Sequence, residues 1–312
     1  MKSLFSNKYF TGFTAVYIIA ATILCYWFHE SLINVLQVSI SLGIVFPLMA
    51  WLLFNKSNTL IPNKPVVKAE PFIILGVIGY NIIYLVYGTG WINQLIPQNI
   101  LEVQWKADIY VLIKKITVFI LLPFLFFKLI GFGWRDFGFI RGRSVIFNKR
   151  TILALGTLFI LMIAFQLSES KRGSELLKGE FSIRQLLIGI PLCFLWLCFE
   201  AGLAEEFFYR AVLQSRISVL LRSDTAGILI SALIFGLAHA PGLYLRGAGD
   251  EGINEQLPFI FWASYTIVYM SLAGLFLGIT WSRTKNIWLV VILHAMFDLI
   301  PNLGDFIITW KI

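Results

Sequence analysis

Residues 186–206 read LLIGIPLCFLWLCFEAGLAEE, and this stretch decides what kind of protein the chain forms. It is a mostly apolar run of about 20 residues, the length that a helix needs to cross the hydrocarbon core of a bilayer. The run ends in Glu205 and Glu206, and adjacent carboxylates are rare in such a context. Because ionisable groups inside spanning segments are costly, they usually mark function. The stretch therefore predicts a transmembrane helix and a place to look for chemistry.

Apolar runs of this kind recur along the whole chain, and about nine of them are long enough to span a bilayer. They cover approximately residues 9–28, 33–54, 71–93, 109–130, 151–168, 185–205, 226–243, 258–281 and 287–308. Composition agrees, since only 13% of the residues are charged, whereas a soluble domain carries about a quarter. We predict an all-α, polytopic integral membrane protein with about nine transmembrane helices, the first of them retained rather than cleaved as a signal peptide.

The net charge of +8 is explained by basic loops between the spans, and no basic helix or RNA motif indicates nucleic-acid binding. The most basic loop lies between the fourth and fifth runs. It carries Lys128, Arg135, Arg141, Arg143, Lys149 and Arg150 against the single acidic residue Asp136. The positive-inside rule places this loop in the cytoplasm, so that the N-terminus is cytoplasmic and the C-terminus is outside. Lys114 and Lys115, near a helix start, are expected to snorkel to the interface.

Chemistry concentrates in three C-terminal segments, of which the first is Glu205-Glu206-Phe207-Phe208-Tyr209-Arg210. On a helix, Glu206 and Arg210 are four residues apart and share a face, where they can neutralise one another. Glu205 points about 100° away and is expected to lack that partner. An unpaired carboxylate in a low dielectric holds its proton more tightly, which suits a general base. Alternatively, both glutamates merely pair with Arg210 at the interface.

The other two segments are Phe235-Gly236-Leu237-Ala238-His239 and His294-Ala295-Met296-Phe297-Asp298. His294 and Asp298 are four residues apart and therefore share a helix face. A lone membrane histidine is more often a helix-packing group than a ligand. Two of the chain's three histidines, together with a carboxylate on a third helix, instead suggest that Glu205, His239 and His294 surround one water.

Two kinds of hydrolytic centre fit these residues. Glu205 and His239 could activate the water by general base catalysis, or Glu205, His239 and His294 could hold a zinc ion that does so. The sequence contains no HExxH signature, so the spacing of these residues alone does not support zinc. The expected cofactor is none, with zinc as the alternative. In a linear topology Glu205 and His239 lie near opposite membrane faces. They meet only if the helix around Glu205 runs on through Leu221, or if a Pro241-Gly242 break lies within the membrane.

The three segments match the motifs EExxxR, FxxxH and HxxxN/D, in that order and on consecutive hydrophobic segments. Over about residues 185–305 the chain resembles the CAAX protease and bacteriocin-processing family of intramembrane endopeptidases, which includes the type II CAAX prenyl endopeptidases. The resemblance implies that Glu205 is the catalytic glutamate and that His239 is its partner in activating water. Glu206, Arg210 and Phe235 would support the site.

The resemblance also implies that His294 and the residue at position 298 stabilise the oxyanion. The eukaryotic prenyl endopeptidases carry Asn at the position of Asp298. Since an ionised Asp cannot donate a hydrogen bond, Asp298 would instead be protonated, orient His294, or bind a metal.

The expected organisation is N-terminal transmembrane helices of unknown role at 1–130, a basic cytoplasmic loop at 131–150 and a membrane-embedded protease domain at 151–312. The expected function is an intramembrane endopeptidase, metal-dependent or metal-free, in a prokaryotic plasma membrane. Its substrate would be a membrane-associated protein or peptide, prenylated or not, and the family also allows bacteriocin processing. The alternatives are a non-enzymatic immunity factor or scaffold, and a transporter that relays protons.

Overall fold

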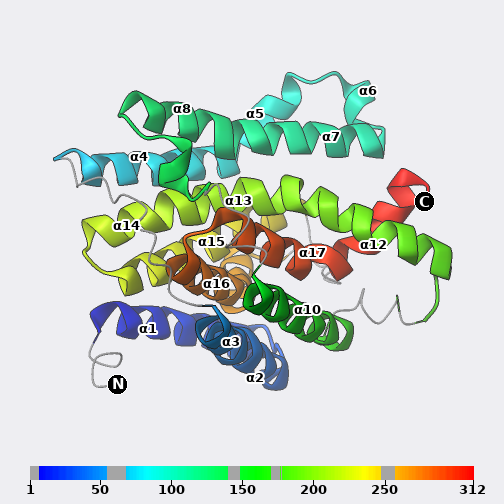
Figure 1. The fold of residues 1–312 in the computed structure, drawn as a ribbon, viewed down its shortest axis with the longest axis horizontal. Coiled ribbons are helices and arrows are strands. Elements are labelled where there is room, and N and C mark those ends of the chain that lie inside the picture. Colours follow the sequence, from blue (N-terminus) through cyan, green and yellow to red (C-terminus); the bar gives the residue numbers. More distant parts are fainter. Residues whose placement is uncertain (1–6, 55–67, 140–147, 170–175, 177, 247–256) are drawn as a thin grey trace. The chain divides into compact units, whose positions relative to one another are not determined.

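The computed structural model describes residues 7–54, 68–139, 148–169, 176, 178–246 and 257–312 of the chain. Helices dominate these residues, and no strand occurs among them (Figure 1). Within this described part, nine helical segments are long and apolar enough to cross a membrane. They are Lys8–Trp27, Leu32–Leu53, Glu70–Gln94, Gln104–Leu129, Lys149–Leu167, Ile183–Leu220, Asp224–Leu245, Phe259–Thr284 and Ile287–Trp310. Each overlaps one predicted span, so the prediction of an all-α polytopic membrane protein is confirmed.

The sixth span is much longer than its apolar run predicts. It comprises α12 (Ile183–Leu197), η6 (Cys198–Leu203), α13 (Ala204–Glu206), η7 (Phe207–Gln214) and α14 (Ser215–Leu220) in unbroken succession. The conjecture that this helix continues beyond Glu205 is therefore confirmed, since the span ends only at Leu220.

The expected break at Pro241-Gly242 is not present, and that prediction is wrong. Helix α15 extends from Asp224 to Arg246 and continues through Pro241. A proline removes only one backbone donor from a helix, and membrane helices tolerate this where neighbouring groups satisfy the freed carbonyl.

Several spans contain π-helical turns, in which each N–H bonds the carbonyl five residues back. Two of these segments directly precede a helix with proline in its first turn. Segment η2 (Ser41–Val45) leads into α3 (Phe46–Leu53), which contains Pro47, and η4 (Ile116–Leu121) leads into α8 (Leu122–Leu129), which contains Pro123. Since a proline ring clashes with the carbonyl four residues back, a wider turn at this point relieves the clash.

The helices form two compact units, each discontinuous in sequence. The first unit contains residues 1–94 and 209–284, and the second contains 95–208 and 285–312. The predicted division into functional halves at the loop 131–150 stays a prediction, and residues 140–147 of that loop lie outside the described residues.

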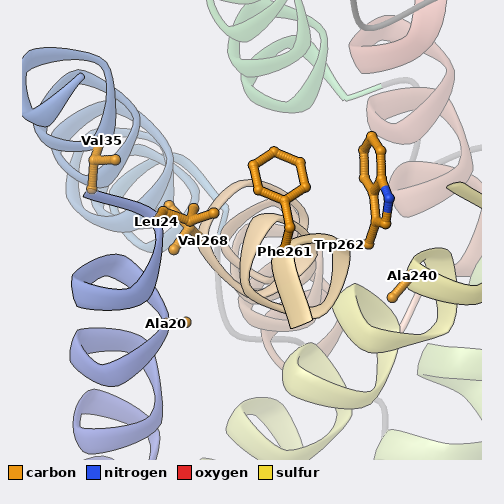
Figure 2. Packing of buried hydrophobic residues seen from close by; sticks show 7 residues of the cluster. All are labelled: Ala20, Leu24, Val35, Ala240, Phe261, Trp262 and Val268. Carbon is orange, nitrogen blue, oxygen red and sulfur yellow. The ribbon is translucent and has the colours of Figure 1, made fainter. Parts of the chain in front are cut away.

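The first unit is built on α15 and α16 (Phe259–Thr284), which pack along each other. Glycine permits this contact, because a Cβ atom on Gly236 would lie 2.7 Å from the Thr266 carbonyl oxygen. Helices α1 (Lys8–Thr22), α2 (Leu32–Ile40) and α3 also pack on α16. Helices α1, α2, α15 and α16 share a hydrophobic cluster, whose buried residues are Ala20, Leu24, Val35, Ala240, Phe261, Trp262 and Val268 (Figure 2).

The N-terminal span of α4 (Glu70–Ile83), η3 (Tyr84–Gly88) and α5 (Thr89–Gln94) also belongs to the first unit. Its α4 contacts α14, where the buried side chains of Glu70 and Arg216 form an ion pair. Asn81 donates to the hydroxyl oxygen of Tyr209 at 3.1 Å. These buried polar contacts bind an N-terminal helix to the end of the sixth span.

The second unit surrounds α17 (Ile287–Trp310), which packs on α10 (Lys149–Glu169), α12 and η6. Here too small residues allow close approach, since a Cβ atom on Gly189 would lie 2.7 Å from the Ile307 side chain. The remaining elements are α6 (Gln98–Leu101), α7 (Gln104–Lys115), η4, α8 and the 3-10 turn η5 (Trp134–Phe137). This unit carries both adjacent glutamates and the histidine of the last span.

Candidate active site

His294 lies between two carboxylates in the second unit. Its Nδ1 is 2.7 Å from Oε1 of Glu206, and its Nε2 is 3.2 Å from Oδ2 of Asp298. The prediction that His294 and Asp298 share a helix face is confirmed. A proton on each ring nitrogen satisfies both contacts, and so does a proton on Asp298 in place of the second. The contact lets Asp298 orient His294, and it fits both the ionised and the protonated form of Asp298.

Glu205 sits on α13, beside the same histidine. Its Oε2 is 3.9 Å from Nε2 of His294, and its Oε1 accepts a hydrogen bond from Nζ of Lys115 at 3.2 Å. The expectation that Glu205 lacks an ionic partner is therefore wrong. The partner was not foreseen because it comes from α7, far away in the sequence.

Lys115 also contacts a third carboxylate, with Nζ 2.8 Å from Oε1 of Glu200. Glu200 and Glu205 are five residues apart, which on a regular α-helix puts them about 140° from each other. The wider turn of η6, which contains Glu200, brings residues five apart toward the same side. Both glutamates can therefore reach one ammonium group.

Sequence reasoning missed Lys115 and Glu200 as members of the site. Lys115 was expected near a helix start, but it lies inside the fourth span, and its ammonium group ends among carboxylates. The signal that was available is the charge itself, because a lysine within a spanning segment is costly unless it is paired. Its two partners could not be found from their spacing, because residues five apart lie on different faces of a regular α-helix.

His239 belongs to α15 in the first unit, where its Nδ1 lies 2.8 Å from the carbonyl oxygen of Phe235. A carbonyl oxygen only accepts, so Nδ1 carries a proton, and in the neutral imidazole Nε2 then keeps its lone pair. The Phe235 ring contacts the imidazole, with centroids 4.9 Å apart. The Arg210 guanidinium lies over the Phe235 ring, with its Cζ 4.5 Å from the ring centroid. These contacts agree with a supporting role for Phe235.

The predicted residues thus fall into two groups. Glu205, Glu206, His294 and Asp298 lie together in the second unit, whereas Arg210, Phe235 and His239 lie together in the first. The convergence of His239 with Glu205, and the pairing of Glu206 with Arg210, stay predictions.

A zinc site does not fit the arrangement around His294. A zinc ligand must direct a nitrogen lone pair at the metal, but both nitrogens of this ring face carboxylate oxygens. Among the residues that the structure describes, no group of three or more His, Cys, Asp or Glu side chains is arranged to hold a metal ion.

A family model described as type II CAAX prenyl endopeptidase Rce1-like matches residues 187–300. Comparison with curated proteins and with solved structures finds no match. The matched segment contains all three motifs in order, from Glu205 to Asp298, whereas Lys115 lies outside it. Residues 187–300 of this chain are therefore similar to the Rce1-like family of type II CAAX prenyl endopeptidases.

Proposed function

We propose that the chain is an intramembrane endopeptidase that hydrolyses a peptide bond of a membrane-associated protein or peptide, with Glu205 as general base. The observation that carries the proposal is the contrast between the adjacent glutamates. The Glu206 side chain is fully buried against His294, whereas that of Glu205 keeps 12% of its surface exposed. Of the two carboxylates, Glu205 is the one that a water molecule can reach.

The reaction follows from this assignment. Glu205 takes a proton from water, and the resulting hydroxide adds to the scissile carbonyl carbon. The tetrahedral intermediate then collapses as the carbon–nitrogen bond breaks, and the leaving nitrogen takes the proton from Glu205. The products are a carboxylic acid, which gives its proton to the amine or to water, and an amine, and the glutamate returns to its starting state. His239 stays the proposed partner of Glu205 in activating the water, as the family resemblance implies, and its support is that the contact of Nδ1 with a carbonyl fixes the tautomer of the ring.

His294 acts in this proposal as a positioning residue rather than as an oxyanion donor. Both of its nitrogens are directed at carboxylates, so an N–H aimed at a substrate oxyanion would have to leave one of them. The support for its role is that it contacts Glu205, Glu206 and Asp298 at once.

The substrate class is inferred from the family. The description of the matching family as prenyl endopeptidases makes a prenylated peptide the first probe, with the same peptide lacking its lipid beside it. The basic loop between the fourth and fifth spans supports a cytoplasmic N-terminus, and we place the chain in a prokaryotic plasma membrane.

Cleavage of the two peptides by the purified full chain in detergent tests the proposal. Glu205→Gln is expected to lower kcat/KM by about 10²- to 10⁴-fold, the usual contribution of a positioned base. Glu102→Gln is the matched control, because Glu102 is exposed and the substitution removes the same charge. The control should cleave at the wild-type rate, and a chelator should leave that rate unchanged.

Equal rates for Glu205→Gln and the wild type would overturn the assignment of the base. Loss of activity with the chelator and its return with zinc would overturn the metal-free mechanism. A folded wild-type protein that cleaves neither peptide would instead favour the non-enzymatic immunity or scaffold function.

A further inference from the structure

We propose that Lys115 is a positioning residue for the Glu205 base and that Glu200 holds the lysine in place. The inference rests on the proposed function. Lys115 lies on α7, outside the segment 187–300 that matches the family, so a helix of otherwise unassigned role would complete the site.

The geometry is that of one cation between two carboxylates. Nζ of Lys115 lies 2.8 Å from Oε1 of Glu200 and 3.2 Å from Oε1 of Glu205, both within hydrogen-bonding distance. An ammonium group has three donors, so it can serve both oxygens simultaneously. Bonds between ionised groups are shorter and stronger than neutral ones, which fixes the Glu205 side chain.

The contact selects one oxygen of the base. Lys115 holds Oε1 of Glu205, whereas Oε2 is the oxygen that faces His294 at 3.9 Å. A base held by one oxygen presents the other in a constant direction, and such orientation contributes to the rate. A neighbouring cation also favours the ionised form of a carboxylate, which is the form that accepts a proton.

Glu200 adds a second carboxylate beside Glu205, and Lys115 contacts both. Without the lysine, the carboxylates of Glu200 and Glu205 would remain close together on one side of the sixth span with no shared cation between them. Like charges in a low dielectric disfavour each other, so the two groups would share a proton or turn apart. Either change removes an oriented, ionised base.

The first test is Lys115→Met against Lys106→Met in the peptide-cleavage assay. Lys106 lies on the same helix, and its ammonium group rests 5.6 Å from the centre of the Trp105 ring, so the control removes the same charge without touching the cluster. We expect Lys115→Met to lower kcat by at least about tenfold with KM changed by less than about threefold, because the lysine orients a group used only in the chemical step.

The second test adds Glu200→Gln to Lys115→Met. Removing the competing carboxylate should restore kcat by about threefold or more over Lys115→Met alone, and Lys115→Arg should keep more activity than Lys115→Met. A lysine that only supports the fold predicts additive losses. Wild-type kcat for Lys115→Met, or a further loss on adding Glu200→Gln, would overturn the inference.

Two arms separate this inference from the proposed function. An inactive Glu205→Gln beside an active Lys115→Met defeats only the role of the lysine, whereas an active Glu205→Gln defeats the proposed function.

Thermal unfolding tests the coupling of Lys115, Glu200 and Glu205 without any cleavage assay. Lys115→Met should lower the midpoint, and adding Glu200→Gln with Glu205→Gln should recover part of that loss. Additive losses in the midpoint would show that the charges are not coupled.

Discussion

At the scale of single residues, His294 is a partner of the buried carboxylate of Glu206. The neighbouring Glu206 side chain has no exposed surface, and a buried carboxylate is tolerated only where a partner compensates it. Asp298 contacts the other nitrogen of the same ring, Nε2, but keeps 29% of its side-chain surface exposed. The two carboxylates should therefore depend on the histidine to different degrees.

Replacement of His294 by leucine should destabilise the protein by about 3 to 5 kcal/mol, since it leaves the Glu206 carboxylate buried without this partner. Asp298→Ala removes a partly exposed contact and should cost less than about 1 kcal/mol. Thermal unfolding of both variants in one detergent measures the difference. Equal midpoints for the two variants would show that His294 does not compensate Glu206.

At the scale of elements, the close approach of η6 and α17 places the glutamates beside His294. Gly202 of η6 makes this approach possible, because a Cβ atom there would lie 2.9 Å from the carbonyl oxygen of Val291. Val291 precedes His294 by less than one helical turn. A shift of α17 at this point would therefore move the histidine away from Glu206.

Gly202→Ala should lower both the unfolding midpoint and kcat, because the backbone of α17 must retreat to admit the methyl group. Gly156→Ala on α10 is the matched control, since nothing lies within 4 Å of a Cβ atom there. In a helix interior that control should be neutral or stabilising by up to about 1 kcal/mol. The unfolding midpoint and kcat of both variants are measured on the same preparations. Equal midpoints and equal kcat values for Gly202→Ala and Gly156→Ala would contradict the prediction.

The existence of these elements was predictable, but their internal geometry was not. Runs of apolar residues suffice to locate spanning helices, since the bilayer imposes their length. The π-helical turns over residues 198–214 depend on which carbonyl each amide reaches, and the order of apolar and polar side chains does not specify this. For that reason the sequence predicted that His294 and Asp298, four residues apart, share a helix face, but missed the meeting of Glu200 and Glu205 at Lys115.

At the scale of the whole molecule, the family-matched segment is not a packing unit. Its residues 209–284 belong to the first unit, and its remaining parts belong to the second. Helices α15 and α16 bury their faces against α1, and α14 contacts α4, where Glu70 pairs with Arg216. The motifs alone gave no indication of this dependence, because the N-terminal helices contribute to the fold through packing and through single polar contacts such as that of Glu70 with Arg216.

A fragment containing only residues 183–312 should therefore fail to form a stable, monodisperse protein. Co-expression with residues 1–182 as a separate chain should restore it, because the apolar faces of α15 and α16 regain their partners. Size-exclusion chromatography and thermal unfolding in detergent measure both outcomes. A fragment that is as stable alone as with its complement would show that the N-terminal helices are dispensable.

The length of the sixth span has a consequence for where the chemistry takes place. Its 38 residues give a contour of about 57 Å at 1.5 Å per residue, against a hydrocarbon thickness of about 30 Å. Such a helix must slant or project from the lipid, so the acyl-chain length of the host membrane controls the immersion of the glutamates that it carries. Lipid composition would then act, alongside peptide sequence, as a selector of the bond that is cut.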